Sequence, residues 1–232
     1  MPYSGSVSSS AGSTSGSRNK PNPPIATSAG ILVKEDSGTF VYQSFFLYIC
    51  NLNYDLLDMF SDITPPKFRQ AVAADTDQIC AILRLAVNRM LAEGKHQWDN
   101  NYPTRTHVAE DIAHGIGYVI EHDERVIAYG AIVTDGEPAY AKIDGSWLSD
   151  RQYVVVHRMA VHPNSECRGI GLLFLQEAEK LALSQGITDF RLDTNFDNFR
   201  MLRLIEKFGF TYCGEIYYEG GSRRAFEKLL PS

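Results

Sequence analysis

The stretch from Val161 to Leu172 combines a proline, a basic side chain and two glycines in the order Val-His-Pro-Asn-Ser-Glu-Cys-Arg-Gly-Ile-Gly-Leu. A β-branched run precedes it and apolar residues with helical spacing follow it, so we expect a strand, a turn and a helix. The first N–H groups of such a helix lie at the positive end of its dipole, where a pyrophosphate binds. Glycines let the backbone approach the phosphates closely.

A histidine, His157, stands in the strand that leads into this turn. Imidazole titrates near neutral pH and can remove a proton from a nucleophile as a general base. Without a bulge, His157 would share one side of its strand with Met159. Asp193, in the next predicted strand, is the weaker candidate because it could instead pair with Arg158 or Arg191. The alternative for His157 is a histidine that is only hydrogen-bonded within the sheet.

The elements that must position these residues follow a regular pattern from Lys67 onward. Helical spacing and N-cap or glycine signals predict helices at 75–93, 106–114, 170–185 and 198–208. Alternating or β-branched runs predict strands at 67–72, 117–121, 126–133, 153–161, 190–195, 210–218 and 223–229. This order describes an α/β fold of the α+β type, with a central mixed β-sheet flanked by helices. The strand–helix–strand unit at 153–195 should be parallel and right-handed.

Three separated signals occur in one order: Val161-His-Pro163, Arg168-Gly-Ile-Gly171, and Asn198 followed by Lys207-Phe-Gly-Phe210. Together they resemble the GCN5-related N-acetyltransferase (GNAT) superfamily, over Phe68 to Leu229. The Rossmann fingerprint is absent, and no Gly-Lys-Ser/Thr follows the glycines as in a Walker loop. The resemblance implies the acyl-CoA N-acyltransferase fold and acetyl-CoA as the acyl donor.

The resemblance also implies which residues hold acetyl-CoA. Backbone groups at the turn would cradle the pyrophosphate, the strand before it would pair with the pantetheine arm like an added strand, and an asparagine would meet the pantetheine or the thiol. That asparagine could equally be only a helix N-cap. The residues concerned are Cys167, Arg168, Gly169, Ile170, Gly171 and Leu172 for the pyrophosphate, Met159, Ala160 and Val161 for the pantetheine, and Asn198.

Two positions depart from the family pattern. Glu166 stands where Gln or Arg is usual, and we expect it to point to solvent. Ile205 stands where many members carry the tyrosine that protonates the departing thiolate. Tyr217 or Tyr218 could replace that acid, although both could simply be packing residues of an amphipathic strand. Water could also protonate the thiolate, because a thiol with a pKa near 8.5 leaves readily.

By the same resemblance, the reaction is acetyl transfer to a primary amine of a small molecule or a peptide, by direct attack in a ternary complex. A backbone N–H near Met159 would stabilise the oxyanion. The loop residues Trp98, Asp99 and Tyr102 could line the acceptor pocket, with Asp99 supplying charge. Trp98 could instead fasten the loop to the core. The alternative function is a non-catalytic acyl-CoA sensor, which Glu166 and Ile205 would favour.

Bulk properties restrict the partners. The chain of 232 residues has a formal net charge of −6, which does not favour nucleic acid or an anionic membrane surface. Its four cysteines form no Cys-x-x-Cys pair, so we expect no metal site and a reducing compartment, the cytoplasm. It has no apolar run of about 20 residues that would cross a membrane. The sequence also allows the chain to assemble as a homodimer.

The N-terminal segment differs in composition from the rest. Residues 1–29 are rich in Ser, Gly, Pro and Asn, which predicts disorder, a tag or a linker. Residues 31–60 are rich in Phe, Tyr and Leu but show no clean period, and could be an arm that packs on a partner or on the body of the protein, or translated upstream sequence. Because the patterned sequence begins just after Met59, we expect Met59 to be the native start. We therefore predict an N-terminal extension at 1–58 and a single GNAT domain at 59–232.

Overall fold

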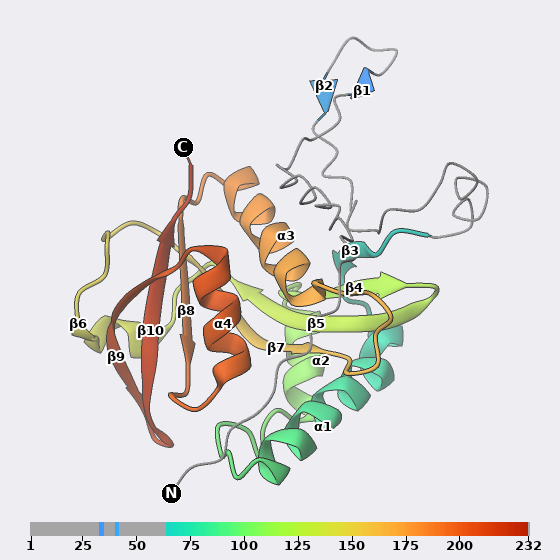
Figure 1. The fold of residues 1–232 in the computed structure, drawn as a ribbon, viewed down its shortest axis with the longest axis horizontal. Helices are drawn as coiled ribbons and strands as arrows, with labels where there is room; N and C mark the ends of the chain where they lie inside the picture. Colours follow the sequence, from blue (N-terminus) through green and yellow to red (C-terminus); the bar gives the residue numbers. More distant parts are fainter. Residues whose placement is uncertain (1–32, 35–39, 42–63, 232) are drawn as a thin grey trace, which may run out of the picture. The chain divides into compact units, whose positions relative to one another are not determined.

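The computed structural model describes residues 64–231 and two short strands nearer the N-terminus (Figure 1). Those strands, β1 (Val33–Lys34) and β2 (Phe40–Val41), pair antiparallel within a separate unit of the chain. Apart from these four residues, the predicted extension, its apolar arm and the expected start at Met59 lie outside the described residues.

The predicted order of strands and helices is confirmed from residue 67 onward. Between the strands predicted at 126–133 and 153–161, where the sequence pattern indicates no helix or strand, the structure has two short elements, η3 and β6. The elements are β3 (Lys67–Gln70), η2 (Ala73–Asp75), α1 (Thr76–Ala92), α2 (Arg105–Ala113), β4 (Gly117–His122), β5 (Arg125–Val133), η3 (Pro138–Lys142), β6 (Asp144–Gly145), β7 (Val154–Val161), α3 (Ile170–Ser184), β8 (Asp189–Thr194), α4 (Phe199–Phe208), β9 (Thr211–Tyr218) and β10 (Gly221–Leu229).

The strands from β3 to β10 form one mixed sheet in the order β3-β4-β5-β7-β8-β10-β9-β6. Strands β7 and β8 pair in parallel, as predicted for the strand–helix–strand unit, and the other neighbours in this sheet pair antiparallel. The parallel pairing is short: it joins Val154 to Phe190 and Val155 to Arg191. Beyond Val155 the two strands separate, so the edge of β7 that faces β8 is left unpaired.

Helices cover both faces of this sheet (Figure 1). On one face α3 and α4 bury Phe174, Phe190 and Ile205 against the strands. On the other face α1 and the following loop pack on β4 and β5 through residues such as Ile82 and Trp98. Fully burying one such side chain contributes roughly 1.5–3 kcal/mol, so these two clusters hold the sheet between its helices.

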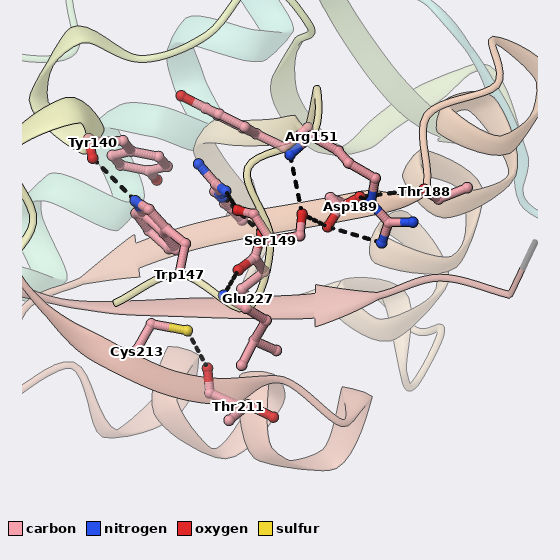
Figure 2. Close-up of polar contacts among 12 residues, drawn as sticks. Tyr140, Trp147, Ser149, Arg151, Thr188, Asp189, Thr211, Cys213 and Glu227 are labelled. Atoms are coloured by element: carbon pink, nitrogen blue, oxygen red, sulfur yellow. Dashed lines mark hydrogen bonds and ion pairs between the residues drawn. The ribbon is translucent and has the colours of Figure 1, made fainter. Parts of the chain in front are cut away.

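The second half of that other face, over β7 and β9, is covered by the segment at 135–153. Tyr140 packs there with Val155, Ile216 and Ala225, and the indole of Trp147 donates a hydrogen bond to the carbonyl of Tyr140 at 3.0 Å (Figure 2). We call this segment the strap. It matters for function because it brings Glu137 to the face of the sheet on which His157 lies.

A buried arginine fastens the strap to the sheet. Arg191 of β8 forms an ion pair with Glu227 of β10 at 2.8 Å and donates to the carbonyl of Ser149 at 2.5 Å. Its guanidinium lies between the rings of Trp147 and Tyr153, 4.2 and 4.0 Å from their centroids. Removing one partner of such a buried pair costs about 3–5 kcal/mol, because the other charge is then left without compensation.

A second set of contacts fixes the end of the strap, as Figure 2 shows. Asp189 is fully buried and receives hydrogen bonds from the hydroxyl of Ser149 and from Thr188, at 3.2 Å for the latter. Arg151 pairs with the same carboxylate at 2.8 Å. The part of the strap from Leu148 to Arg151 is therefore bound to β8 and β10.

Candidate active site

A bulge in β7 lies next to the place where β7 and β8 separate. Ala131 of β5 pairs with His157, but Tyr129 pairs with Ala160, so one extra residue of β7 stands opposite Gly130. Arg158 takes up the extra length with a φ of +53°, in the left-handed region that L-residues rarely adopt. A side chain on Gly130 would come within 2.8 Å of the Phe174 ring, so the residue opposite the bulge has to be glycine.

The bulge changes which way the site residues point. His157 lies on the strap side of the sheet with Val155, whereas Met159 and Val161 pack on the α3/α4 side. His157 and Met159 would share one side only in a strand without a bulge, and here the extra residue Arg158 breaks the alternation. His157 therefore lies on the face of the sheet that the strap covers.

His157 contacts a carboxylate from the strap. Its Nε2 lies 3.2 Å from Oε2 of Glu137, and the two side chains are 18% and 19% exposed. Glu137 is held in place because its other oxygen accepts the N–H of Ala139 at 3.1 Å and its own N–H donates to the hydroxyl of Tyr153 at 3.1 Å. The hydrogen bond from His157 lowers the pKa of Glu137 below its ordinary value, against the opposing effect of burial.

Asp193 forms a second cluster beside this pair. Its carboxylate accepts hydrogen bonds from Tyr140 at 2.8 Å, from Arg223 at 3.1 Å and from Tyr218 at 3.4 Å. The expected pairing with Arg158 or Arg191 is not found, since these pair with Asp111 and Glu227. Asp193 accepts hydrogen bonds from three donors and so holds the side chains of Tyr140, Tyr218 and Arg223 in place.

The two candidate tyrosines lie on opposite sides of β9. Tyr218 points toward Asp193 and is half-buried, and its burial, followed by the nearby charge of Asp193, raises its pKa well above 10. Tyr217 is 57% exposed on the other side of the strand. The structure thus brings Tyr218, and not Tyr217, to the side of the sheet that carries His157. Ile205 is 1% exposed in the core, so its position supplies no acid.

The glycine turn begins α3 as predicted. Gly169 caps the helix with a φ of +76°, and no side chain caps the helix there. The first N–H groups of the helix, at Ile170, Gly171 and Leu172, therefore have no intrahelical acceptor and are available to an anion. A side chain on Gly171 would lie 3.2 Å from Leu204 and 3.4 Å from Met159, so the glycine lets α3 approach the site.

The side chains within the turn have separate environments. Glu166 is exposed, in line with the expectation that it points to solvent, and Arg168 is exposed beside it. Cys167 is half-buried, and burial raises the pKa of its thiol. A thiol in that state is a weak nucleophile, so the turn's chemistry is that of its backbone.

Asn198 caps α4 and also contacts the loop that holds Trp98, Asp99 and Tyr102, which we call the acceptor loop. Its Oδ1 accepts the N–H of Met201 at 3.4 Å, and its Nδ2 donates to Thr194 at 3.1 Å and to Gln97 at 3.4 Å. Gln97 was not among the predicted site residues, because a glutamine beside a tryptophan gives no sequence signal. The neighbouring Asp197 has a buried carboxylate oxygen with no hydrogen-bond donor among the described residues.

The three predicted acceptor-loop residues have different surroundings. Trp98 is 6% exposed and packs in the α1/α2 core, which corresponds to the alternative of a loop fastened to the core. Asp99 is exposed and accepts the N–H of Asn101 at 2.7 Å, which closes a tight turn. Tyr102 alone reaches the bulge, where its hydroxyl accepts a hydrogen bond from Arg158 at 3.3 Å.

Arg158 also fastens the bulge to α2. It donates to both carboxylate oxygens of Asp111, at 2.9 and 2.5 Å, and Tyr129 donates to the same carboxylate. Burial, together with the charge of Asp111, raises the pKa of Tyr129 well above 10, so it remains a donor. This ion pair was missed in the sequence because it depends on the bulge. It fixes the backbone between His157 and Ala160.

Among residues that the structure describes, no group of three or more His, Cys, Asp or Glu side chains could hold a metal ion. No helix of the described part is long and apolar enough to cross a membrane.

Comparison with known proteins identifies the family. The family model described as "Acetyltransferase (GNAT) family" matches residues 67–210, more than half of the chain. A GNAT-family acetyltransferase from Streptococcus agalactiae 2603 is 30% identical, with a TM-score of 0.66, and the match covers 73% of this chain and 98% of that one.

Two structures with lower identity share the fold. One is a GNAT-family acetyltransferase from Listeria monocytogenes 4b F2365, with 18% identity, a TM-score of 0.57, and coverage of 71% of this chain and 95% of that one. The other is yncA, a putative acetyltransferase from Salmonella typhimurium solved with acetyl-CoA, with 19% identity, a TM-score of 0.54, and coverage of 73% and 96%. No curated protein matches the chain. The match of the family model and the relative from Streptococcus together show that the chain belongs to the GNAT family of acetyltransferases.

Proposed function

We propose that this acetyltransferase transfers the acetyl group of acetyl-CoA to a primary amine of a small molecule or a peptide, by direct attack in a ternary complex. The observation that carries the proposal is the pairing of His157 with Glu137 beside the point where β7 and β8 separate. A proton acceptor there would face an amine entering from the side of the strap and α1. A thioester between the strands would lie within the same opening.

The described residues fit acetyl-CoA at three places. The uncapped N-terminus of α3 suits the pyrophosphate. The unpaired edge of β7 at Met159, Ala160 and Val161 suits the amides of the pantetheine arm, because β5 pairs only the other edge. Beside Asn198, the buried oxygen of Asp197 lacks a donor that an amide N–H could supply. Bound there, acetyl-CoA supplies the activated acyl group.

The attacking amine must first lose a proton, since an amine with a pKa near 10 is mostly protonated at neutral pH. We assign this step to His157, directly or through a water molecule, with Glu137 orienting the imidazole. As the tetrahedral centre forms, its oxyanion would accept a hydrogen bond from a backbone N–H near Met159, which the bulge turns away from β5. No covalent enzyme intermediate is needed.

The departing thiolate needs at most one proton. Tyr218 is our candidate for the donor because Asp193 holds its hydroxyl on the side of the sheet that carries His157, although its raised pKa makes the phenol a weak acid. Tyr217, the other candidate from the sequence, lies exposed on the opposite side of β9. Water can replace Tyr218, so the acid contributes less than the base.

Thiol release from acetyl-CoA in the presence of a panel of amines tests the proposal. We expect release that depends on an amine, acetylated products by mass spectrometry, and a large loss of kcat in His157→Ala. If acetyl-CoA binds but no amine supports thiol release, and if His157→Ala changes nothing, the acyl-CoA sensor becomes the better account. The buried Ile205, which supplies no acid, is the feature that favours this second function.

We also propose that the protein works in a reducing compartment such as the cytoplasm, with an amine as its partner and neither nucleic acid nor membrane. The described cysteines Cys80, Cys167 and Cys213 are free thiols, which supports this setting. A homodimer is the assembly that we would test first. Analytical ultracentrifugation of the purified chain measures it directly.

A further inference from the structure

Arg223 is the only arginine whose guanidinium contacts the carboxylate of Asp193 among the described residues. It lies on β10 and donates through Nη1 to Asp193 at 3.1 Å, and its side chain is 21% exposed. The guanidinium also stacks over the ring of Tyr218, 4.2 Å from its centroid. It is therefore held in one orientation by an ion pair and an aromatic face, which is unusual for an arginine that still reaches solvent.

This arrangement leaves one edge of the guanidinium unused. Arginine can bind a carboxylate with two parallel hydrogen bonds through the edge formed by Nε and Nη2. Neither of these atoms donates a hydrogen bond to any residue that the structure describes. Asp193 neutralises the charge of Arg223 but occupies only Nη1. The Nε/Nη2 edge thus remains as a rigid, solvent-accessible pair of donors.

The edge belongs to the same group of side chains as the candidate base. Asp193 links Arg223 to Tyr140 and Tyr218, and the charge of Arg223 helps to lower the pKa of Glu137, which contacts His157. An acceptor beside the His157–Glu137 pair would therefore meet the carboxylate of Glu137 at one end and the guanidinium of Arg223 at the other. That sequence of charges matches a molecule that carries both an ammonium and a carboxylate.

We infer that Arg223 binds a carboxylate of the acceptor through Nε and Nη2, and that the acceptor is therefore an amino acid. This inference rests on the proposed acetyl transfer and names the substrate class of the same site. The ammonium approaches His157 and Glu137, and the carboxylate is fixed by two charge-assisted hydrogen bonds. His157 first removes one proton from the ammonium. The neutral amine then forms the amide N–C bond as the C–S bond of acetyl-CoA breaks, and the second proton of the nitrogen passes through Tyr218 or water to the departing thiolate.

The test compares matched acceptors. A set of L-amino acids, each with its carboxamide and its decarboxylated amine, is assayed for acetyl-CoA-dependent thiol release. We expect the wild-type protein to favour the carboxylates in kcat/KM by about 10- to 100-fold, the range for hydrogen bonds between charged groups. Arg223→Met should remove this preference, mainly through KM. Arg223→Lys keeps the charge opposite Asp193 but lacks the two-donor edge, so it should lose most of the preference while the protein stays folded.

Arg224 provides the matched control. It is the next residue on β10, and its guanidinium lies over the ring of Phe196 at 5.0 Å, on the opposite side of the strand from Arg223. Arg224→Met removes the same charge from the same strand, and the ratio of kcat/KM between amino acids and their amides should stay unchanged.

A binding measurement separates the inference from the proposed function. Isothermal titration with N-acetylated amino acids and with their amides reports carboxylate recognition without any turnover. Tighter binding of the acids that disappears in Arg223→Lys supports the inference even if no acceptor is acetylated. Equal binding of acids and amides, or equal kcat/KM for both in the wild type, overturns it. In the second case acetyl transfer itself would still stand.

Discussion

The imidazole Nε2 of His157 lies 3.2 Å from the carboxylate of Glu137, and the two residues come from elements with different roles. His157 belongs to β7, the strand that borders the opening in the sheet, and Glu137 begins the strap that covers β7 and β9. Because the N–H of Glu137 donates to Tyr153 and its Oε1 accepts the N–H of Ala139, its carboxylate is held beside the imidazole. A carboxylate in this position selects the tautomer and the orientation of the histidine.

Replacing Glu137 by Gln should lower kcat by about 10- to 100-fold, no more than the low end of the roughly 10²–10⁴-fold that a general base contributes, because Glu137 only orients the imidazole. The amide keeps the size of the side chain but cannot stabilise the imidazolium that forms during proton transfer. Glu137→Asp retains the charge and should recover part of the loss. Steady-state kinetics across pH 5.5–9 measure the effect, and we expect the acidic limb of kcat/KM to change shape in Glu137→Gln.

The matched control for this change is Asp135→Asn, an exposed carboxylate two residues earlier in the same segment. It should leave the kinetics unchanged. Equal losses in both variants would mean that charge in this segment acts at a distance. No loss in either would remove Glu137 from the mechanism.

The ion pair between Arg158 and Asp111 should contribute more to stability than any surface pair. Arg158→Met leaves the buried carboxylate of Asp111 without its partner and should lower the free energy of unfolding by about 3–5 kcal/mol. Urea denaturation followed by fluorescence measures this. In the double variant Arg158→Met/Asp111→Leu, the loss should be smaller than the sum of the two single losses, because the uncompensated charge is gone. Additive losses would contradict the coupling.

The sequence predicts those parts of the site that depend on local backbone chemistry. The start of α3 is marked by Arg168-Gly-Ile-Gly171, and the N-cap of α4 by Asn198, because glycine and asparagine act within their own turns. The order of the strands along the chain likewise follows from the pattern of apolar residues. These features need no knowledge of distant contacts.

The parts that were not predicted depend on contacts between distant segments. The bulge at Arg158 has no sequence signal of its own, since it is stabilised by Asp111 on α2 and by the glycine opposite it. Glu137 lies in a segment for which the sequence predicts neither a helix nor a strand. Its contact with His157 depends on the strap folding back over β7. A bulge reverses the side of the strand to which each later side chain points, which is why Met159 does not share the side of His157.

Tyr218→Phe and Tyr217→Phe should separate the two tyrosines. Removing the hydroxyl of Tyr218 deletes the proton donor held by Asp193, and kcat should fall by about 3- to 30-fold, which is less than the roughly 10²–10⁴-fold of a full general acid because water can replace it. Tyr217→Phe alters an exposed side chain and should leave kcat within about twofold of the wild type, a change of less than 0.5 kcal/mol in the barrier. Pre-steady-state measurement of thiol release provides the comparison. A larger effect at Tyr217 would reassign the acid.

The pair of Arg69 and Asp75 should make stability depend on pH. Two hydrogen bonds from Arg69, at 2.7 and 2.9 Å, and one from the N–H of Val72 at 2.8 Å lower the pKa of Asp75 below its ordinary value. A carboxyl whose pKa is lowered by folding stabilises the protein above its unfolded pKa, about 3.9, and loses this contribution as the pH falls through its folded pKa. Asp75→Asn should therefore cost about 2–3 kcal/mol at pH 7, the scale of hydrogen bonds to a charged group, and progressively less below about pH 4.

Asp77→Asn is the control for that experiment, because Asp77 pairs with Arg105 on the surface, where the side chains are 84% and 64% exposed. An exposed pair contributes at most about 1 kcal/mol, so this variant should unfold close to the wild type at every pH. Urea denaturation at pH 7, 5 and 3.5 gives the three differences in unfolding free energy. A difference for Asp75→Asn that stays constant from pH 7 to 3.5 would mean that the asparagine disturbs the turn before α1 by its shape and not through the lost charge.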